Sequence, residues 1–421
     1  MHILGRRPAV AVFAAAVCAT ALLLTACTSS GNPAPKVPST LAIGLLVSTT
    51  GPNAAIGQQA QLGAKLAIEL VNNDVKDLPI NLPLSTGVGL RNGAKLTLVV
   101  GNTDSAPEKV EKEASRLVQD GAVGLVLADT LDVAAPAGRE TDTIGVALVD
   151  ALSTADTFVD LNRAAHFRIQ PSDRQMVSTA LALLYRERDS TSQFNRVITA
   201  SGKASGATGD EIASVRTSIE DLSLAAGYEI GGKEQIALNA DGAGDSDFIE
   251  KGDAVLAIVT NAQEAAAASE LAGRLKGKAP VIALGPGVGA LDAIKGNNQV
   301  LRASGWSGEF AGRNPIARIV GGMFEQAFHA KMTDVAAAAF TATMLLALAM
   351  DSVTDLSPPV VRNAVQQLSL PATQTVMPWN GIRFDGSGYN QLAAGVIEQH
   401  VPNGYQVIHP IELAATPTLS L

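Results

Sequence analysis

Hydroxyl, amide and carboxylate side chains follow several short apolar segments of this sequence, where they could hydrogen-bond a small ligand. Parallel strands end at one edge of their sheet, and the loops and helix N-termini at that edge supply ligand donors and acceptors. The same residue types are also ordinary helix N-caps and turn formers, so both roles are open at each position. The candidates are Ser48, Thr49 and Thr50; Asp129, Thr130 and Asp132; Asp150, Ser153 and Thr154; and Thr260 with Asn261.

Patterns for catalysis or metal binding are weak. The sequence has no G-x-S-x-G elbow, and Gly202-Lys203 lacks the earlier glycine of a P-loop. No histidine stands four residues from another or beside a cysteine, as a zinc site would favour. We therefore expect no catalytic residue, cofactor or metal. An extracytoplasmic hydrolase is the weakest alternative, because no nucleophile and base pair is recognisable.

Alternating apolar strands and amphipathic helices must position the candidate residues. The run from Leu41 to Val47 ends at Ser48-Thr49-Thr50-Gly51-Pro52, which is typical of a strand buried on both faces. Leu62, Leu66 and Leu70 then recur with helical spacing. The resulting βαβαβ order predicts a parallel, doubly wound sheet. Its later members are strands 96–100, 123–127 and 146–149 and helices 108–119 and 133–141.

A second series of the same kind predicts a second, similar α/β lobe. The Ala-rich stretch 335–350, bounded by Asp334 and Asp351, is too short to span a bilayer comfortably and reads as a buried helix. The second series consists of strands 196–199, 255–259 and 281–284 and helices 210–226 and 262–275.

The first 26 residues have the features of a secretory signal: Arg6 and Arg7, an apolar run from Ala9 to Leu24, and small residues before Cys27. The sequence Leu24-Thr25-Ala26-Cys27 resembles the lipobox of bacterial lipoproteins. This resemblance implies lipidation of Cys27 and anchoring at the outer face of the cytoplasmic membrane. The alternative is an uncleaved membrane anchor, because the apolar run approaches the ~20 residues that span a bilayer.

Composition bounds the class of the remaining chain. Removing 26 of the 421 residues leaves 395, enough for two or three core-forming units. The formal charge changes from −9 to −11 because the signal contains two arginines. Such an acidic body is a poor partner for nucleic acid. Residues 27–40 are small, polar and rich in proline, as in a flexible tether.

Several motifs occur in an order that resembles the Leu/Ile/Val-binding class of type I periplasmic solute-binding proteins of ABC transporters. The opening IGLLVSTTGPNAAIGQQAQLGAKLAIELVN, Ile43 to Asn72, is a strand, a Ser/Thr-Gly-Pro turn and a helix with Gly-Ala-x-x-Ala. The further matches are 107–121, Phe167-Arg168-Ile169 before Pro171-Ser172-Asp173, Gly252-Asp253-Ala254-Val255, and Asn380-Gly381-Ile382-Arg383-Phe384-Asp385 before Gly388.

The resemblance implies the type I periplasmic-binding-protein fold: two α/β lobes joined by a hinge of three crossovers, with a ligand held between them. We place the crossovers near 166–173, 298–305 and 372–378. Lobe one would then comprise 41–169 and 303–374, and lobe two 170–302 and 375–415.

The resemblance also implies site residues. Ser153 and Thr154 keep the hydroxyl groups that bind an amino-acid ligand in the family, with backbone amides of the 48–51 turn, and Thr130 and Asp132 replace a serine run. In lobe two, the family's aromatic and acidic positions read Ser205, Asn261 and Gly287, and its early tyrosine reads Ile56. A buried ammonium without a carboxylate is costly, but Asp129, Asp132 or Asp150 could replace the missing acid from lobe one. Because Thr260 and Asn261 penalise an aliphatic side chain, we expect a small polar solute, such as an amino acid or an amide, rather than a branched-chain amino acid.

The resemblance further implies delivery of the solute to ABC permease subunits. The alternative is a degenerate family member that serves as a sensory or interaction lipoprotein without transport. The missing lobe-two residues favour this alternative, whereas Ser153 and Thr154 favour binding.

Overall fold

The computed structural model describes most of the chain after the predicted signal. The described residues are 39–51, 53–73, 90, 93–157, 163–188, 194–203, 206–231, 235–294, 300–401 and 404–414, without the side chains of 311–313. The predicted signal peptide, nearly all of the predicted tether with Cys27, and Ser205 lie outside these residues.

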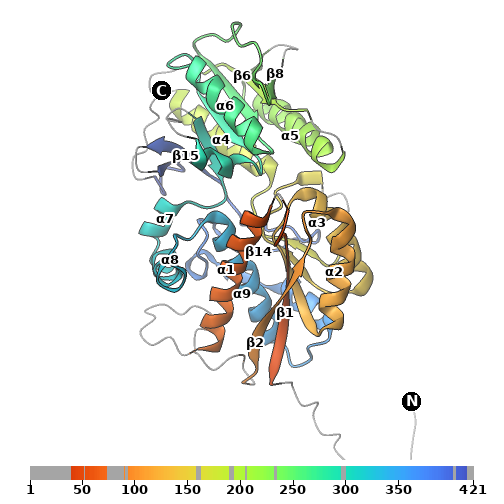
Figure 1. The fold of residues 1–421 in the computed structure, drawn as a ribbon. Coiled ribbons are helices and arrows are strands. Elements are labelled where there is room, and N and C mark those ends of the chain that lie inside the picture. The colour runs from red at the N-terminus through yellow and green to blue at the C-terminus, as the bar shows by residue number, and fades with distance from the viewer. Residues whose placement is uncertain are drawn as a thin grey trace, which may run out of the picture. The chain divides into compact units, whose positions relative to one another are not determined.

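The first sheet has five parallel strands in the order β2-β1-β3-β4-β5 (Figure 1). Strand β1 contains the predicted apolar run, and it pairs with β2 on one side and β3 on the other. The strand order therefore reverses beside β1, as in doubly wound sheets, and ligands bind at such a reversal. The strands are β1 (Thr40–Val47), β2 (Lys95–Asn102), β3 (Ala122–Leu127), β4 (Leu148–Asp150) and β5 (His166–Arg168).

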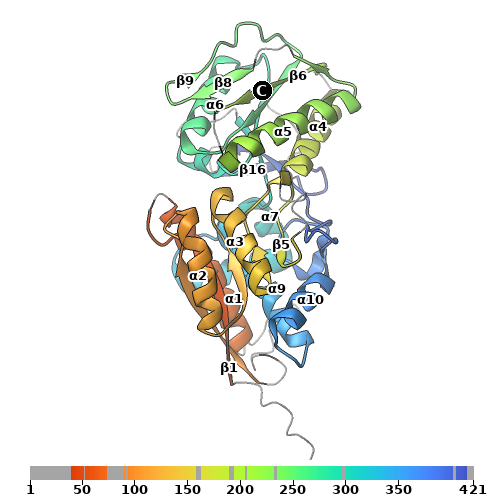
Figure 2. The same cartoon turned by 90° about the vertical axis from the view of Figure 1, so that its right-hand side faces the viewer.

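Helices cover both faces of this sheet (Figure 2). Apolar side chains of α2 and α3 pack on one face in a common core with β1, β3 and β4. Helices α1 and α9 pack against each other and against strands from the other face. The bounds are α1 (Ala54–Asn72), α2 (Pro107–Gln119), α3 (Leu131–Ile144), α8 (Pro315–Phe328), α9 (Asp334–Ser352) and α10 (Pro358–Gln367).

The second sheet has nine strands, and its centre is parallel as predicted. Two core clusters lie on its opposite faces, one with α4 and α5 and the other with α6. Strands β15 and β16 pair antiparallel, as the two residues between them require. The strands are β6 (Arg196–Ser201), β7 (Glu229–Ile230), β8 (Ile236–Asn239), β9 (Gly242–Ala243), β10 (Asp253–Ile258), β11 (Val281–Leu284), β12 (Val300–Ser304), β15 (Val396–Val401) and β16 (Gly404–His409); the helices are α4 (Asp173–Arg188), α5 (Gly206–Ala225) and α6 (Ala262–Arg274).

Short elements complete the chain. Strands β13 (Ser369–Pro371) and β14 (Gly381–Arg383) form a separate antiparallel pair, and α7 (Gly308–Arg313) follows β12. The 3-10 helices are η2 (Val288–Ala293) and η3 (Ala372–Gln374).

The C-terminal part returns to the first sheet before it enters the second. The amide of Arg168 in β5 donates to the carbonyl oxygen of Gly388 (2.8 Å), and the amide of Asn390 donates to the carbonyl oxygen of Arg168 (3.1 Å). Residues 388–390 thus lie beside β5, and the chain first pairs with the second sheet at β15. The predicted third crossover near 372–378 precedes this point. The lobe boundaries given above stay predictions.

The Ala-rich stretch forms α9, a core helix as predicted. Among the described residues, α9 alone is long and apolar enough to cross a membrane, and 78% of its most apolar window is buried within the protein. Its small side chains allow α1 to approach closely: a Cβ atom added at Gly63 would lie 2.0 Å from the carbonyl oxygen of Ala336.

We expect Gly63→Ala to destabilise the protein. Alanine favours a helix by about 1 kcal/mol over glycine, but overpacking of a rigid contact costs about 1–3 kcal/mol, and here the obstacle is backbone. Gly321→Ala in α8 is the matched control, because nothing lies within 4 Å of its added Cβ. Urea unfolding should show a loss for Gly63→Ala and no loss for Gly321→Ala. Equal stability of the two variants would contradict the close α1–α9 contact.

Candidate functional site

The structure brings the predicted polar residues of the first lobe to one edge of its sheet. Ser48, Thr49 and Thr50 follow β1, Thr130 follows β3, and Ser153 and Thr154 follow β4. Strands β1, β3 and β4 are parallel neighbours, so these loops lie at the same carboxyl edge, beside the reversal of strand order. This edge is the candidate site.

Ser48 has a structural role at this edge. It is 1% exposed, and its hydroxyl donates to Asp129 Oδ2 (2.7 Å) and accepts from the amide of Ser105 (2.8 Å). Thr103 also donates to Asp129. Because the donor of Ser48 is used within the chain, its side chain is a support for the loop rather than a free ligand donor.

The loop after β2 belongs to the site but was absent from the predicted set. Asn102 Oδ1 accepts from the amides of Thr49 (2.8 Å) and Asp104 (3.0 Å), and the Thr50 hydroxyl donates to Asp104. Asp104 and Ser105 both have positive φ angles, 56° and 54°. Such backbone is uncommon outside glycine and is often found at functional sites. Polar residues directly after the apolar strand 96–100 were the signal for this loop.

The loop after β4 is built around a buried carboxylate. Asp150 Oδ1 accepts from the amides of Leu152 (3.1 Å) and Ser153 (3.0 Å), and Oδ2 lies 3.0 Å from His166 Nε2. Burial alone would raise the pKa of Asp150, but hydrogen bonding and charge from His166, with the hydroxyl and the amide of Ser153, outweigh it and lower the pKa. Asp150 therefore stays an acceptor that fixes the turn carrying Ser153.

Ser153 is the candidate whose side chain is least engaged within the chain. The residue is 7% exposed, and its hydroxyl lies beside the Asp150 carboxylate and helps to lower the pKa of that group, but it makes no well-formed hydrogen bond among the described residues. Burying a hydroxyl without a partner is unfavourable. Helix α4 is capped by Ser172, whose Oγ accepts from the amide of Gln175 (3.2 Å). The Ser153 hydroxyl thus does not cap α4, and its role in binding a ligand stays a prediction.

Thr130 and Asp132 begin α3 and face the second lobe. Thr130 is the N-cap residue, but its side chain makes no capping hydrogen bond. The hydroxyl of Thr208 in α5 lies 3.4 Å from Asp132 Oδ2. Helices α3 and α5 are neighbours in Figure 2 and in the contacts between elements. The carboxyl edges of the two sheets therefore meet here.

In the second lobe, Asn261 caps a helix. Its Oδ1 accepts from the amides of Gln263 and Glu264, both at 3.0 Å, at the start of α6. Glu264 is buried, and its Oε2 accepts from the amide (2.6 Å) and hydroxyl (2.8 Å) of Thr260. A Cβ atom at Gly202 would lie 1.9 Å from Glu264 Oε1. The Glu264 carboxylate thus lies between the carboxyl ends of β6 and β10. Glu264 was not among the predicted site residues.

The close packing of the loop after β11 accounts for the glycine, in place of an acidic residue, at position 287. A Cβ atom at Gly287 would lie 2.5 Å from the backbone nitrogen of Asn261, so the loop packs directly on the end of β10. The Gly287 amide donates to the carbonyl oxygen of Val259 (2.9 Å). This backbone contact leaves no room for a side chain.

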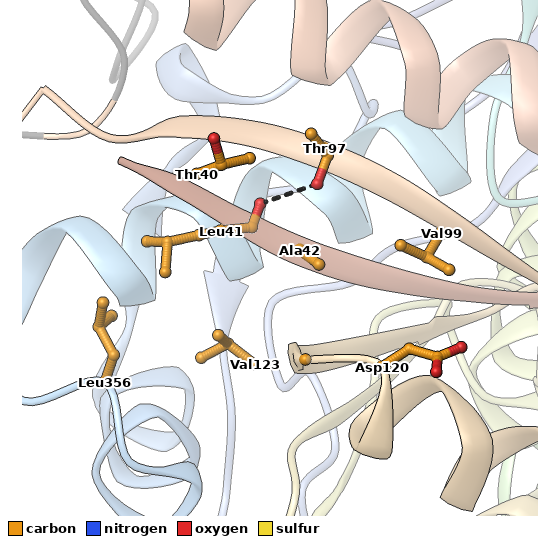
Figure 3. A pocket seen from close by; sticks show the side chains of 9 residues that line it. Thr40, Leu41, Ala42, Thr97, Val99, Asp120, Val123 and Leu356 are labelled. Atoms are coloured by element: carbon orange, nitrogen blue, oxygen red, sulfur yellow. Dashed lines mark hydrogen bonds between the residues drawn. The ribbon is translucent and has the colours of Figure 1, made fainter. Parts of the chain in front are cut away.

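A hollow of about 530 Å³ lies elsewhere, near the amino ends of β1 and β3 (Figure 3). Its apolar wall includes Leu41, Val123 and Leu356, and the Thr97 hydroxyl there donates to the carbonyl oxygen of Leu41 (3.4 Å). It opens at the edge opposite the candidate site and has few polar groups to orient a ligand. Among the described residues, no three His, Cys, Asp or Glu side chains are arranged to hold a metal.

Comparison with known proteins identifies the family. A family model described as "Periplasmic binding protein" matches residues 40–394. No protein of curated function matches the sequence.

Solved structures share the fold. An ABC transporter substrate-binding protein from Desulfitobacterium hafniense, in complex with Leu, is 18% identical with a TM-score of 0.67, covering 87% of this chain and 99% of that chain. A putative branched-chain amino acid ABC transporter protein from Silicibacter pomeroyi is 15% identical with a TM-score of 0.71, covering 90% and 98%. A solute-binding protein from R. palustris, in complex with benzoate, is 17% identical with a TM-score of 0.64, covering 87% and 95%.

These likenesses confirm the predicted type I fold of two α/β lobes. Because the family model spans residues 40–394, the chain belongs to the periplasmic binding protein family, whose members are extracytoplasmic solute-binding proteins that work with ABC transporters.

Proposed function

We propose that this protein is a lipid-anchored receptor that captures a small polar solute between its lobes and delivers it to the permease subunits of an ABC importer. The observation that carries the proposal is the buried hydroxyl of Ser153, which has the Asp150 carboxylate beside it but makes no well-formed hydrogen bond among the described residues, at the edge where the two sheets meet. Thr154 and the backbone amides of the 48–51 turn, apart from that of Thr49, which donates to Asn102, would complete the first-lobe half of the site. The ligand contacts both lobes only when they are closed, so binding shifts the protein toward the closed state.

The solute is polar in this proposal because the second-lobe edge offers polar groups. Thr260, Asn261 and the Glu264 carboxylate gather at the ends of β6 and β10. An aliphatic side chain placed there would leave buried polar groups without partners, which is unfavourable. Leu is the ligand of the D. hafniense protein and benzoate that of the R. palustris protein. We expect neither solute to be preferred here.

The degenerate-receptor alternative also has an observation in its favour. Asn261 uses its carbonyl oxygen as a helix cap, and Gly287 packs against backbone, so neither position acts as the family's ligand residues do. Under this alternative the protein keeps the fold and serves as a sensory or interaction lipoprotein without a transported ligand.

A thermal-shift panel tests the proposal. A ligand at 100 times its dissociation constant stabilises a protein by about 2.7 kcal/mol, which gives a clear shift. We expect a shift with a polar amino acid, an amide or a short polyol, and none with leucine, isoleucine or valine. A shift with leucine or valine alone would refute the polar specificity but keep the receptor function. No shift with any solute would favour the degenerate receptor.

A further inference from the structure

Glu211 of the second lobe holds a segment of the first lobe. It lies near the start of α5, is 6% exposed, and its Oε1 accepts from the amide of Asp156 (3.1 Å). Its Oε2 accepts from the amide (3.3 Å) and the hydroxyl (2.6 Å) of Thr157. This one carboxylate therefore satisfies three donors of the loop that also carries Ser153 and Thr154.

Helix α4 holds the same loop from its N-terminus. The amide of Asp173 donates to the carbonyl oxygen of Thr154 (2.9 Å), and the amide of Arg174 donates to Asp156 Oδ2 (2.7 Å). Residues 154–157 are thus attached both to α4 and, through Glu211, to α5. Movement of this loop away from the second lobe would break all of these bonds.

The side chain of Asp173 lies against Glu211. Asp173 is 1% exposed, and its carboxyl group is within hydrogen-bonding reach of the Glu211 carboxylate and of the Thr154 hydroxyl, whereas its Oδ1 has no hydrogen-bond partner among the described residues. A buried carboxyl group that touches a second one is hard to ionise. A proton on Asp173 would turn the repulsion into a hydrogen bond to Glu211.

We propose that Asp173 holds a proton and donates it in a hydrogen bond to Glu211, and that this hydrogen bond fastens residues 154–157 of the first lobe to the second lobe. Asp173 and Glu211 are then positioning residues for the loop that carries Ser153 and Thr154. The consequence for ligand affinity rests on the proposed function, whereas the fastening itself does not.

The surrounding charges agree with a held proton. Burial, followed by the charge and hydrogen bonding of Glu211 and the charge of Asp156, raises the pKa of Asp173 well above its ordinary value. Burial also raises the pKa of Asp156. The other titratable groups packed around this cluster are Arg168 on β5, whose charge acts on Asp156, and Tyr389 and Asp385, which lie beside Arg168.

The sign of the pH dependence follows from the raised pKa. Asp173 binds its proton more tightly when residues 154–157 are held against the second lobe than when they are released, because the released Asp173 has the ordinary pKa of an aspartate. Fastening is therefore complete below the ordinary pKa of aspartate and is lost as the pH rises through the raised pKa. Each unit of difference between the two pKa values is a factor of about ten in the opening equilibrium.

Hydrogen exchange of the full chain, without added ligand, measures the fastening directly, because Glu211 accepts from the amides of Asp156 and Thr157. After correction for intrinsic exchange rates, we expect their protection to fall at least about tenfold between about pH 5 and about pH 9. Asp173→Asn keeps a donor toward Glu211 at every pH, so its protection should be high and independent of pH. Glu211→Ala should lose protection at both values.

Asp210→Asn is the matched control, because Asp210 is exposed and next to Glu211 on α5. It should behave as the unchanged protein. Protection that is independent of pH in the unchanged protein, or that falls with pH in Asp173→Asn as well, would overturn the proposal. Because no ligand is added, this result is independent of whether the protein proves to bind a solute.

Discussion

Cys27→Ser should release the protein from the membrane or leave it as unprocessed precursor. In the predicted lipobox, Cys27 is the residue that receives the lipid. The diacylglyceryl group that such a site receives supplies two acyl chains. One chain binds membranes only marginally, whereas two anchor a protein stably. Fractionation of cells, followed by mass determination of the N-terminal peptide, should therefore show loss of the lipidated, membrane-bound form.

Cys18→Ser is the control for this experiment. Cys18 lies inside the apolar run and is the chain's other cysteine, so its replacement should leave processing and anchoring unchanged. A Cys27→Ser protein that is still cleaved and membrane-bound at the size of the unchanged protein would contradict the lipoprotein assignment.

Replacing Ser153 and Thr154 with alanine should lower solute affinity about tenfold to hundredfold. Losing a hydrogen bond to a charged or strongly polar ligand group costs ~1.5–3 kcal/mol, and each ~1.4 kcal/mol is a factor of ten in the dissociation constant. The Ser153 hydroxyl makes no well-formed hydrogen bond among the described residues beyond its approach to Asp150, so its removal should lower the stability of the free protein only slightly. Calorimetry with the solute identified from the protein measures the change in affinity.

Ser223→Ala provides a matched comparison. Ser223 is also fully buried with an unpartnered hydroxyl, but it lies near the end of α5, away from the carboxyl edges of the sheets. Its replacement should leave affinity unchanged. If the Ser153→Ala and Thr154→Ala variants keep full affinity and instead melt at a lower temperature, the two residues are structural and the site lies elsewhere.

Much of the fold could be predicted because apolar runs and helical spacing are local signals. The run 41–47 became β1, the Leu62, Leu66 and Leu70 series became α1, and the Ala-rich stretch became the core helix α9. The position of 388–390 beside β5 could not be read in this way. It depends on backbone hydrogen bonds to Arg168, more than two hundred residues earlier.

The candidate site was predictable as a location but not as a set of roles. Ser, Thr, Asp and Asn after strands marked the carboxyl edge correctly, but their individual roles differ. The Ser48 hydroxyl is hydrogen-bonded to Asp129, and the Asn261 side chain caps α6, whereas the Ser153 hydroxyl makes no well-formed hydrogen bond among the described residues. Which partner each side chain finds depends on contacts between distant segments. Glu211 illustrates this, since it stands on a different lobe from the loop it holds.

The most direct measurement of the central claim is mass spectrometry of small molecules bound to the purified protein. The intact protein should carry a solute through native mass spectrometry, and denaturation should release one polar compound in stoichiometric amount that the Ser153→Ala protein retains poorly. Release of leucine, isoleucine or valine would contradict the polar specificity. A protein that carries no solute and gains none from any compound of the thermal-shift panel would contradict the receptor function itself.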